Sequence, residues 1–122
     1  MSHRRTETGK RGEQLAIEFL VAAGYRIVER NYREKCGEID IIARDGPTWV
    51  FIEVKARRNR RYGDPVEAVT FHKQRQISTT ALLYLSRHGL LEAPARFDVI
   101  GVDLADAARP QIAHLKDAFS TG

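Results

Sequence analysis

Hydrophobic and polar residues alternate most regularly over residues 37–57, GEIDIIARDGPTWVFIEVKAR. Alternation with a period of two is typical of β-strands that are buried on at least one face. Between the two alternating runs lies Asp45–Thr48, which contains Gly46, and glycine accepts the backbone angles that tight hairpin turns require. The pattern therefore predicts two antiparallel strands joined by a short turn.

Two acidic residues interrupt the apolar runs of this hairpin. If Gly46 and Pro47 form the loop, Asp40 lies opposite Glu53, and opposed residues have Cβ atoms about 5 Å apart on one sheet face. Two carboxylates at that distance repel each other unless a proton or a cation lies between them. Lys55 points to the same face as Glu53 because side chains alternate along a strand. We therefore predict a small divalent-metal site, which a register slip of one residue would abolish.

The rest of the pattern predicts helices and further strands around this hairpin. Apolar residues at helical spacing predict a helix over residues 9–23, which Gly24 would end. A second helix is predicted to begin at Asp64 and to restart with Thr70 as a new N-cap, its main part running to about residue 88. Strands are predicted over residues 25–32, 96–104 and 111–119, and a turn over residues 33–36.

Two polar residues lie at the edges of the apolar faces of these helices. Glu13 could lean into a cleft where the first helix crosses the sheet, although the helix dipole also favours an acid near a helix N-terminus. Lys73 lies beside the apolar stripe formed by Ile77, Ala81, Tyr84 and Leu85, and it could approach the sheet. From the pattern alone, the simpler interpretation is a dipole-stabilising acid for Glu13 and a surface position for Lys73.

The composition fits these elements into one domain. The chain has 122 residues, of which 43% are hydrophobic and 30% charged, as in soluble globular proteins. We expect a flexible basic arm over residues 1–8 and a single domain over residues 9–122. The N-terminal basic residues are not followed by the apolar segment of a secretory signal. Cys36 is the single cysteine, which favours a reducing cytoplasm over a disulfide-stabilised secreted protein.

Positive charge is concentrated in the first two-thirds of the chain. Residues 1–80 contain 16 Lys or Arg against 11 Asp or Glu. Directly after the hairpin come four arginines and a tyrosine: Arg57, Arg58, Arg60, Arg61 and Tyr62. A solvated loop is the simpler interpretation, but guanidinium groups beside a metal site suit phosphates, and a tyrosine ring can stack on a base or sugar. We therefore predict that this loop contacts nucleic acid, with Lys73 as a further candidate.

The remaining polar residues do not predict a second site. The four histidines are not at the spacing of zinc ligands. No nucleophile elbow and no phosphate-binding glycine loop occurs in the sequence. Asp98 and Asp103 are expected to keep an edge strand soluble and to make turn contacts.

An Asp in the second strand and Glu-x-Lys in the third, within the order helix, three strands, helix, strand, resembles the restriction-endonuclease-like superfamily, the PD-(D/E)xK nucleases. Ile39 stands where the superfamily motif has proline. The longer segments GEQLAIEFLVAAGYRIVERNYREKCGEIDIIARDGPTWVFIEVKARRNRRYGDPVEAV, HKQRQISTTALLYL and FDVIGVD are similar to the YraN-like family of bacterial proteins. The resemblance implies an α/β fold with an αβββαβ core, in which helices flank a mixed central sheet.

The superfamily resemblance also implies roles for individual residues. Asp40 and Glu53 would bind Mg²⁺ or Mn²⁺ together with the backbone carbonyl of Val54. Lys55 would orient or help to activate the attacking water. Glu13 matches the first-helix acid of archaeal Holliday-junction resolvases, where that acid supports the metal site.

These observations leave three interpretations open. The leading one is a metal-dependent nuclease acting on nucleic acid, DNA in the first place, including branched or damaged DNA. The second is a nucleic-acid-binding or assembly module that keeps the nuclease fold and does not cleave. The third is an ordinary solvated ion network formed by Asp40, Glu53 and Lys55. Resolution of a four-way junction would need two active sites and hence a homodimer.

Overall fold

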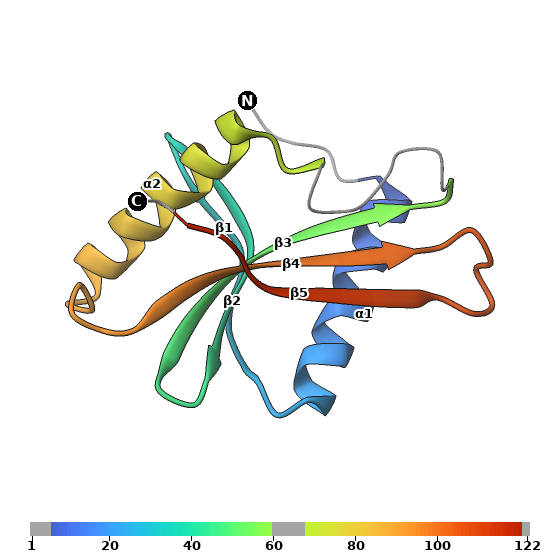
Figure 1. Ribbon diagram of the computed structural model, residues 1–122, viewed down its shortest axis with the longest axis horizontal. Coiled ribbons are helices and arrows are strands. Elements are labelled where there is room, and N and C mark those ends of the chain that lie inside the picture. The colour runs from blue at the N-terminus through green and yellow to red at the C-terminus, as the bar shows by residue number, and fades with distance from the viewer. Residues whose placement is uncertain (1–5, 60–67, 121–122) are drawn as a thin grey trace.

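The computed structural model describes residues 6–59 and 68–120 (Figure 1). In chain order its elements are α1 Glu7–Ala22, β1 Arg26–Glu34, β2 Gly37–Asp45, β3 Thr48–Arg57, α2 Phe71–Arg87, β4 Ala95–Asp103 and β5 Gln111–Phe119. This is the predicted α/β fold, with an αβββαβ core followed by one further strand.

The described strands form one mixed sheet in the order β1-β2-β3-β4-β5. β3 and β4 are parallel, and every other pair of neighbours is antiparallel. A parallel pair needs a crossover connection, which here includes α2. In Figure 1, the right-hand parts of β3, β4 and β5 run across the direction of β1 and β2, so the sheet is strongly twisted.

The first helix begins two residues earlier than the sequence predicts. Thr6 is its N-cap, and the Thr6 side chain accepts a hydrogen bond from the Gly9 amide at 2.9 Å. The predicted arm therefore loses Glu7 and Thr8 to the helix, while residues 1–5 lie outside the described part of the chain. Gly24 follows the helix with φ +94°, as expected for a helix stop.

The second helix begins where the restart was predicted. The Thr70 side chain caps it by accepting a hydrogen bond from the Lys73 amide at 3.2 Å. The predicted first start at Asp64 lies outside the described residues. The four predicted core positions of this helix, Ile77, Ala81, Tyr84 and Leu85, are all buried. Neither this helix nor any other in the described residues is both long and apolar enough to cross a membrane.

The hydrophobic core has one cluster under each helix. Neighbouring strand residues face opposite helices. On the α1 side, Leu20 of the helix packs with Ile41, Ile52 and Ile100. On the α2 side, Tyr84 of the helix packs with Ile42, Phe51 and Val99. A central sheet that is covered on both faces explains why its strands are apolar almost throughout.

The prediction for Asp98 is wrong. β4 lies between β3 and β5 rather than at an edge, and the Asp98 side chain is fully buried. Asp103 behaves as predicted, since its carboxylate accepts a hydrogen bond from the Ala105 amide in the following turn, at 2.9 Å. β1 also differs from the prediction, because it continues through Arg33 to Glu34 before the turn.

Candidate functional site

The hairpin register that the sequence predicts is present. Asp45 pairs with Thr48, and the pairing continues along both strands to Ile41 and Ile52. Gly46 in the turn has φ +59°, the left-handed conformation that glycine adopts without strain. This register brings the next residues back along the two strands, Asp40 and Glu53, to neighbouring positions.

Asp40 turns its carboxylate onto the backbone of β3. Its Oδ2 atom accepts a hydrogen bond from the Val54 amide at 2.8 Å, just beyond the last register pair, Ile41 and Ile52. The bond fixes the Asp40 carboxylate directly beside Glu53. Val54, the residue whose carbonyl the resemblance assigns to the metal, thus contacts Asp40 through its amide.

A change of face in β1 accompanies this geometry. Residues two apart in a strand normally share a face, but Arg30 reaches Gln14 of α1, with Nη2 3.5 Å from Oε1, while the Tyr32 ring packs against Tyr84 of α2 with centroids 5.0 Å apart. Between them, Asn31 has φ +55°. The left-handed residue therefore turns the strand over.

β2 changes face at the matching position. Ile41 lies in the core cluster under α1, whereas Ile39 lies in the cluster under α2. The register places Asp40 beside Asn31 at this crossing. The Asn31 Oδ1 atom is buried and has no hydrogen-bond partner in the described part of the chain. Asn31, which the sequence analysis missed, therefore lies next to Asp40 where both strands change face.

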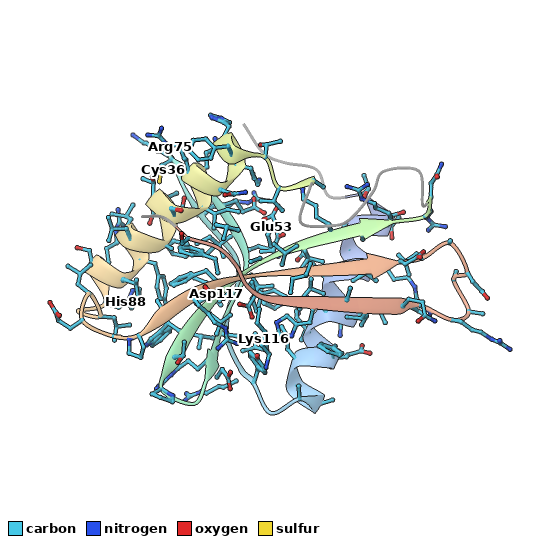
Figure 2. All side chains as sticks on the ribbon, viewed as in Figure 1. Cys36, Glu53, Arg75, His88, Lys116 and Asp117 are labelled. Carbon is cyan, nitrogen blue, oxygen red and sulfur yellow. The ribbon has the colours of Figure 1, made fainter. Side chains whose placement is uncertain are left out.

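Glu53 lies on the sheet near the start of α2 (Figure 2). Its side chain is 6% exposed, and its Oε2 atom is 3.4 Å from Lys55 Nζ and 3.8 Å from Lys73 Nζ. Burial and then repulsion from Asp40 raise the pKa of Glu53 from 4.5 to about 7, against the opposing effect of the two lysines. The two carboxyl groups are therefore short of positive charge even beside two ammonium groups.

Lys73 is closer to the acids than its simplest interpretation predicted. The first turn of α2 directs its ammonium group at Glu53 from outside the sheet, whereas Lys55 approaches along β3. A helical residue 20 positions away in the sequence can reach Glu53 only because α2 packs against β2 in tertiary structure. No local sequence pattern contains that information.

Glu13 occupies a buried position on α1 and is 6% exposed. It follows Gly12, which lies against Ala56 of β3. Within residues 6–59 and 68–120, no three His, Cys, Asp or Glu side chains gather into a group that could hold a metal ion. The geometry thus gives a pair of acids, Asp40 and Glu53, and the role of Glu13 stays a prediction.

The predicted arginine loop is only partly described. Arg57 ends β3, and the exposed Arg58 follows it, donating from Nε to the Thr8 hydroxyl of α1 at 2.6 Å. Arg60, Arg61 and Tyr62 lie outside the described residues. Because Arg57 and Arg58 continue the strand that carries Glu53 and Lys55, positive charge lies close to the acid pair along the sequence.

A second cluster of polar side chains surrounds Asp98 on the α1 side of the sheet. Its carboxylate contacts Arg96 Nε at 3.0 Å and His114 Nε2 at 2.7 Å, and it accepts a hydrogen bond from the Asp117 amide at 3.0 Å. The Asp117 amide is available because the pairing of β4 with β5 is irregular between Phe97 and Val99. Burial alone would raise the pKa of Asp98, but these hydrogen bonds lower it. We assign this cluster a structural role.

The fold and the site at Asp40 and Glu53 define an α/β protein whose twisted mixed sheet holds two adjacent carboxyl groups beside two lysines. The chain belongs to Uncharacterised protein family UPF0102, whose family model matches residues 12–102. This confirms the resemblance to the YraN-like family.

Relatives in several bacteria match almost the whole chain. A UPF0102 protein of Geotalea uraniireducens is 57% identical over 111 residues, which cover 91% of this chain and 87% of the relative. A UPF0102 protein of Geobacter sulfurreducens is 51% identical over 118 residues, covering 97% and 92% of the two chains. A UPF0102 protein of Symbiobacterium thermophilum is 52% identical over 111 residues, covering 91% and 94%.

Proposed function

We propose that this protein is a nuclease that hydrolyses phosphodiester bonds with a divalent cation held by Asp40 and Glu53. The observation that carries the proposal is the adjacent pair of carboxyl groups, the half-buried Asp40 and the buried Glu53, with Lys55 beside them at the point where β2 and β3 stop pairing. The resemblance to PD-(D/E)xK nucleases supplies the reaction class, because the same residue types occupy the same elements.

The residues at the site fit Mg²⁺ or Mn²⁺. Both cations prefer carboxylate and carbonyl oxygens as ligands and retain water in the remaining positions. The raised pKa of Glu53 supports a site that is short of positive charge, and a divalent cation would remove the repulsion between the two acids. Val54 would add its carbonyl oxygen, as the resemblance implies.

The other residues would act on the attacking water and on the phosphate. A bound cation lowers the pKa of a coordinated water and neutralises the charge that develops on the phosphate. Lys55, 3.4 Å from Glu53, would orient that water and supply a second positive centre. Lys73, whose Nζ atom is 3.8 Å from Glu53 Oε2, would help to hold Glu53 in place from α2. Arg57 and Arg58 would bind phosphates of the same strand.

Cleavage of labelled nucleic acids tests the proposal. A panel of single-stranded, duplex, flapped and four-way-junction DNA, with matching RNA, would be incubated with Mg²⁺ or Mn²⁺. We expect Asp40→Asn, Glu53→Gln and Lys55→Ala each to lower the cleavage rate at least about 100-fold, the usual scale for such groups. Glu92→Gln, at an exposed loop position, should cleave like the wild type. Activity that survives all three substitutions would place the reaction at another site.

The second candidate function is a nucleic-acid-binding module that does not cleave. It is favoured by the finding that the described residues give two acids, and not three, at the site. Such a module would bind DNA with an affinity that falls steeply with salt, and added Mn²⁺ would leave that affinity unchanged. A nuclease would instead bind its substrate more tightly when the cation neutralises the two acids.

A further inference from the structure

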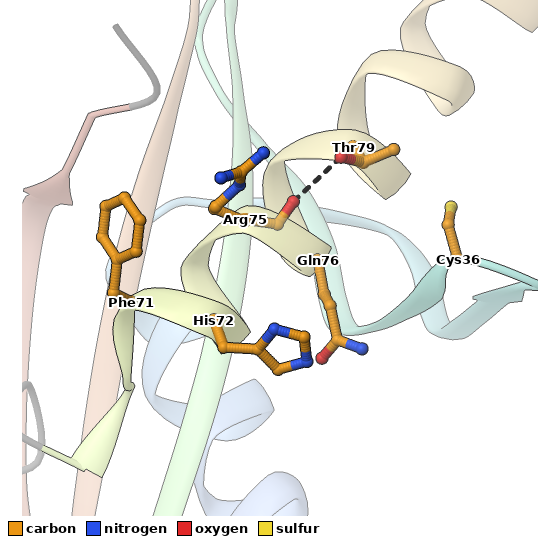
Figure 3. A pocket seen from close by; sticks show the side chains of 6 residues that line it. All are labelled: Cys36, Phe71, His72, Arg75, Gln76 and Thr79. Atoms are coloured by element: carbon orange, nitrogen blue, oxygen red, sulfur yellow. Dashed lines mark hydrogen bonds between the residues drawn. The ribbon is translucent and has the colours of Figure 1, made fainter.

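A pocket of about 420 Å³ lies beside α2. It is lined by Cys36, Phe71, His72, Arg75, Gln76 and Thr79. Cys36 belongs to the turn between β1 and β2, and the other five residues belong to the first half of α2. Figure 3 shows His72 and Gln76 side by side on the helix, Phe71 and Arg75 on the neighbouring ridge, and Cys36 across from them. A volume of this size is typical of pockets that bind small organic groups.

The chemistry of the pocket suits a nucleotide. The Phe71 side chain is 73% exposed, and a large aromatic ring at such a position offers a free face for stacking. Arg75 follows one turn later on the same ridge of the helix, so both side chains come from one side of α2. His72, Gln76 and Thr79 can donate and accept hydrogen bonds. None of the six lining residues is acidic, which favours an anionic ligand.

The first turn of α2 connects this pocket with the acid pair. His72 lines the pocket, and the next residue, Lys73, directs its ammonium group to 3.8 Å from Glu53 Oε2. The two sites therefore lie on adjacent faces of one helical turn. A nucleic-acid strand whose phosphate reached the acid pair would have its neighbouring nucleotide close to Phe71 and Arg75.

We propose that this pocket binds an unpaired nucleotide next to the phosphate that is cleaved. Its base would stack on Phe71, and its phosphate would contact Arg75. Inside a duplex both faces of a base are covered by its neighbours, so a protein ring can stack only on a base that has left the duplex or was never paired. The proposal rests on the proposed nuclease function and narrows its substrate to nucleic acid that has unpaired nucleotides at the cleavage position.

Binding measured without cleavage tests this inference. Fluorescence anisotropy would compare the affinity for a labelled single-stranded oligonucleotide with that for its fully paired duplex, as DNA and as RNA. To prevent cleavage, every protein would carry Glu53→Gln and the buffer would contain EDTA. We expect Phe71→Ala to weaken single-strand binding by about tenfold, the loss of one base–aromatic stack, and to leave duplex binding within about twofold. Arg75→Ala should weaken binding and reduce the slope of log affinity against log salt by about one.

The matched control is Leu82→Ala. Leu82 is also on α2 and is 58% exposed, but it does not line the pocket, so both affinities should stay unchanged. Equal losses for single strand and duplex in Phe71→Ala, or no loss at all, would overturn the inference. Cleavage by the wild type without a Phe71 effect would refute the pocket and leave the nuclease proposal intact. If Phe71→Ala selectively weakens single-strand binding but the wild type cleaves none of the substrates, the pocket is supported and the nuclease proposal is refuted.

Discussion

Gly12 brings α1 into close contact with Ala56 of β3, and replacing it tests the packing of the helix on the sheet next to Glu13. A Cβ atom added at Gly12 would lie 2.3 Å from the Cβ of Ala56, whereas carbon atoms in contact are about 3.5–4.0 Å apart. Neither Cβ atom can rotate away, because both are fixed to the backbone. Gly12→Ala must therefore push α1 from the sheet by more than about 1 Å, the difference between those distances.

Two opposing effects set the magnitude. Replacing glycine by alanine inside a helix is worth about 1 kcal/mol in favour of folding. Overpacking a filled core costs about 1–3 kcal/mol, and the upper part of that range applies because the overlap involves no flexible side chain. We expect Gly12→Ala to lower the free energy of unfolding by about 1–2 kcal/mol.

A second substitution separates this clash from other effects. In Ala56→Gly the clashing atom is gone, and the nearest atoms to the Gly12→Ala methyl become the Cα of residue 56 at 3.6 Å and the Cβ of Val102 at 3.9 Å. Both are ordinary contacts. Glycine in a strand costs about 0.5–1 kcal/mol, roughly what alanine gains in the helix. The double variant should therefore be more stable than Gly12→Ala and close to the wild type.

Urea denaturation of the wild type, both single variants and the double variant measures this coupling. If Gly12→Ala is as stable as the wild type, the close approach of α1 to β3 is wrong. If Ala56→Gly fails to restore stability, the loss has another cause than the clash between the two Cβ atoms.

Three further predictions concern buried polar groups. Glu53→Gln should raise the free energy of unfolding at pH 8 by about 1–3 kcal/mol. The pKa of Glu53 is raised from 4.5 to about 7 in the folded protein, so the stability of the wild type falls as the pH rises through that range. Urea denaturation at several pH values that shows the same fall in the variant would contradict this. Asn31→Ala should be less stable than Asn31→Gly by about 1 kcal/mol in the same assay, because φ is +55°; the opposite order would refute strain at Asn31. Asp98→Asn should cost about 3 kcal/mol at pH 7. Because the pKa of Asp98 is lowered in the folded protein, its contribution is complete above the unfolded pKa of about 3.9 and is lost as the pH falls through the folded value, so a difference that stays constant down to pH 2 would contradict the account.

The local parts of the fold could be predicted from the sequence because they depend on neighbouring residues. The alternation over residues 37–57 and the glycine in the turn fix the register, which in turn places Asp40 and Glu53 together. Thr70 was recognisable as a helix cap from its residue type and the apolar stripe that follows. The proposed reaction class comes from the resemblance to the PD-(D/E)xK nucleases.

The missed features depend on contacts between distant parts of the chain. Whether Asp98 lies in an edge strand depends on the pairing of β4 with both β3 and β5, which strand composition does not reveal. The approach of Lys73 to Glu53 depends on how α2 packs on the sheet. For Asn31 the only local signal was its residue type, since asparagine adopts positive φ more readily than most residues do.

The central claim is that Asp40 and Glu53 form a divalent-cation site. Titration calorimetry with Mn²⁺ on the wild type, Glu53→Gln and the exposed control Glu92→Gln measures this most directly. We predict that the wild type and the control bind Mn²⁺ equally, and that Glu53→Gln binds it at least about tenfold more weakly, because a buried carboxylate ligand is lost. Equal binding by Glu53→Gln and the wild type, or no binding by the wild type, would contradict the account.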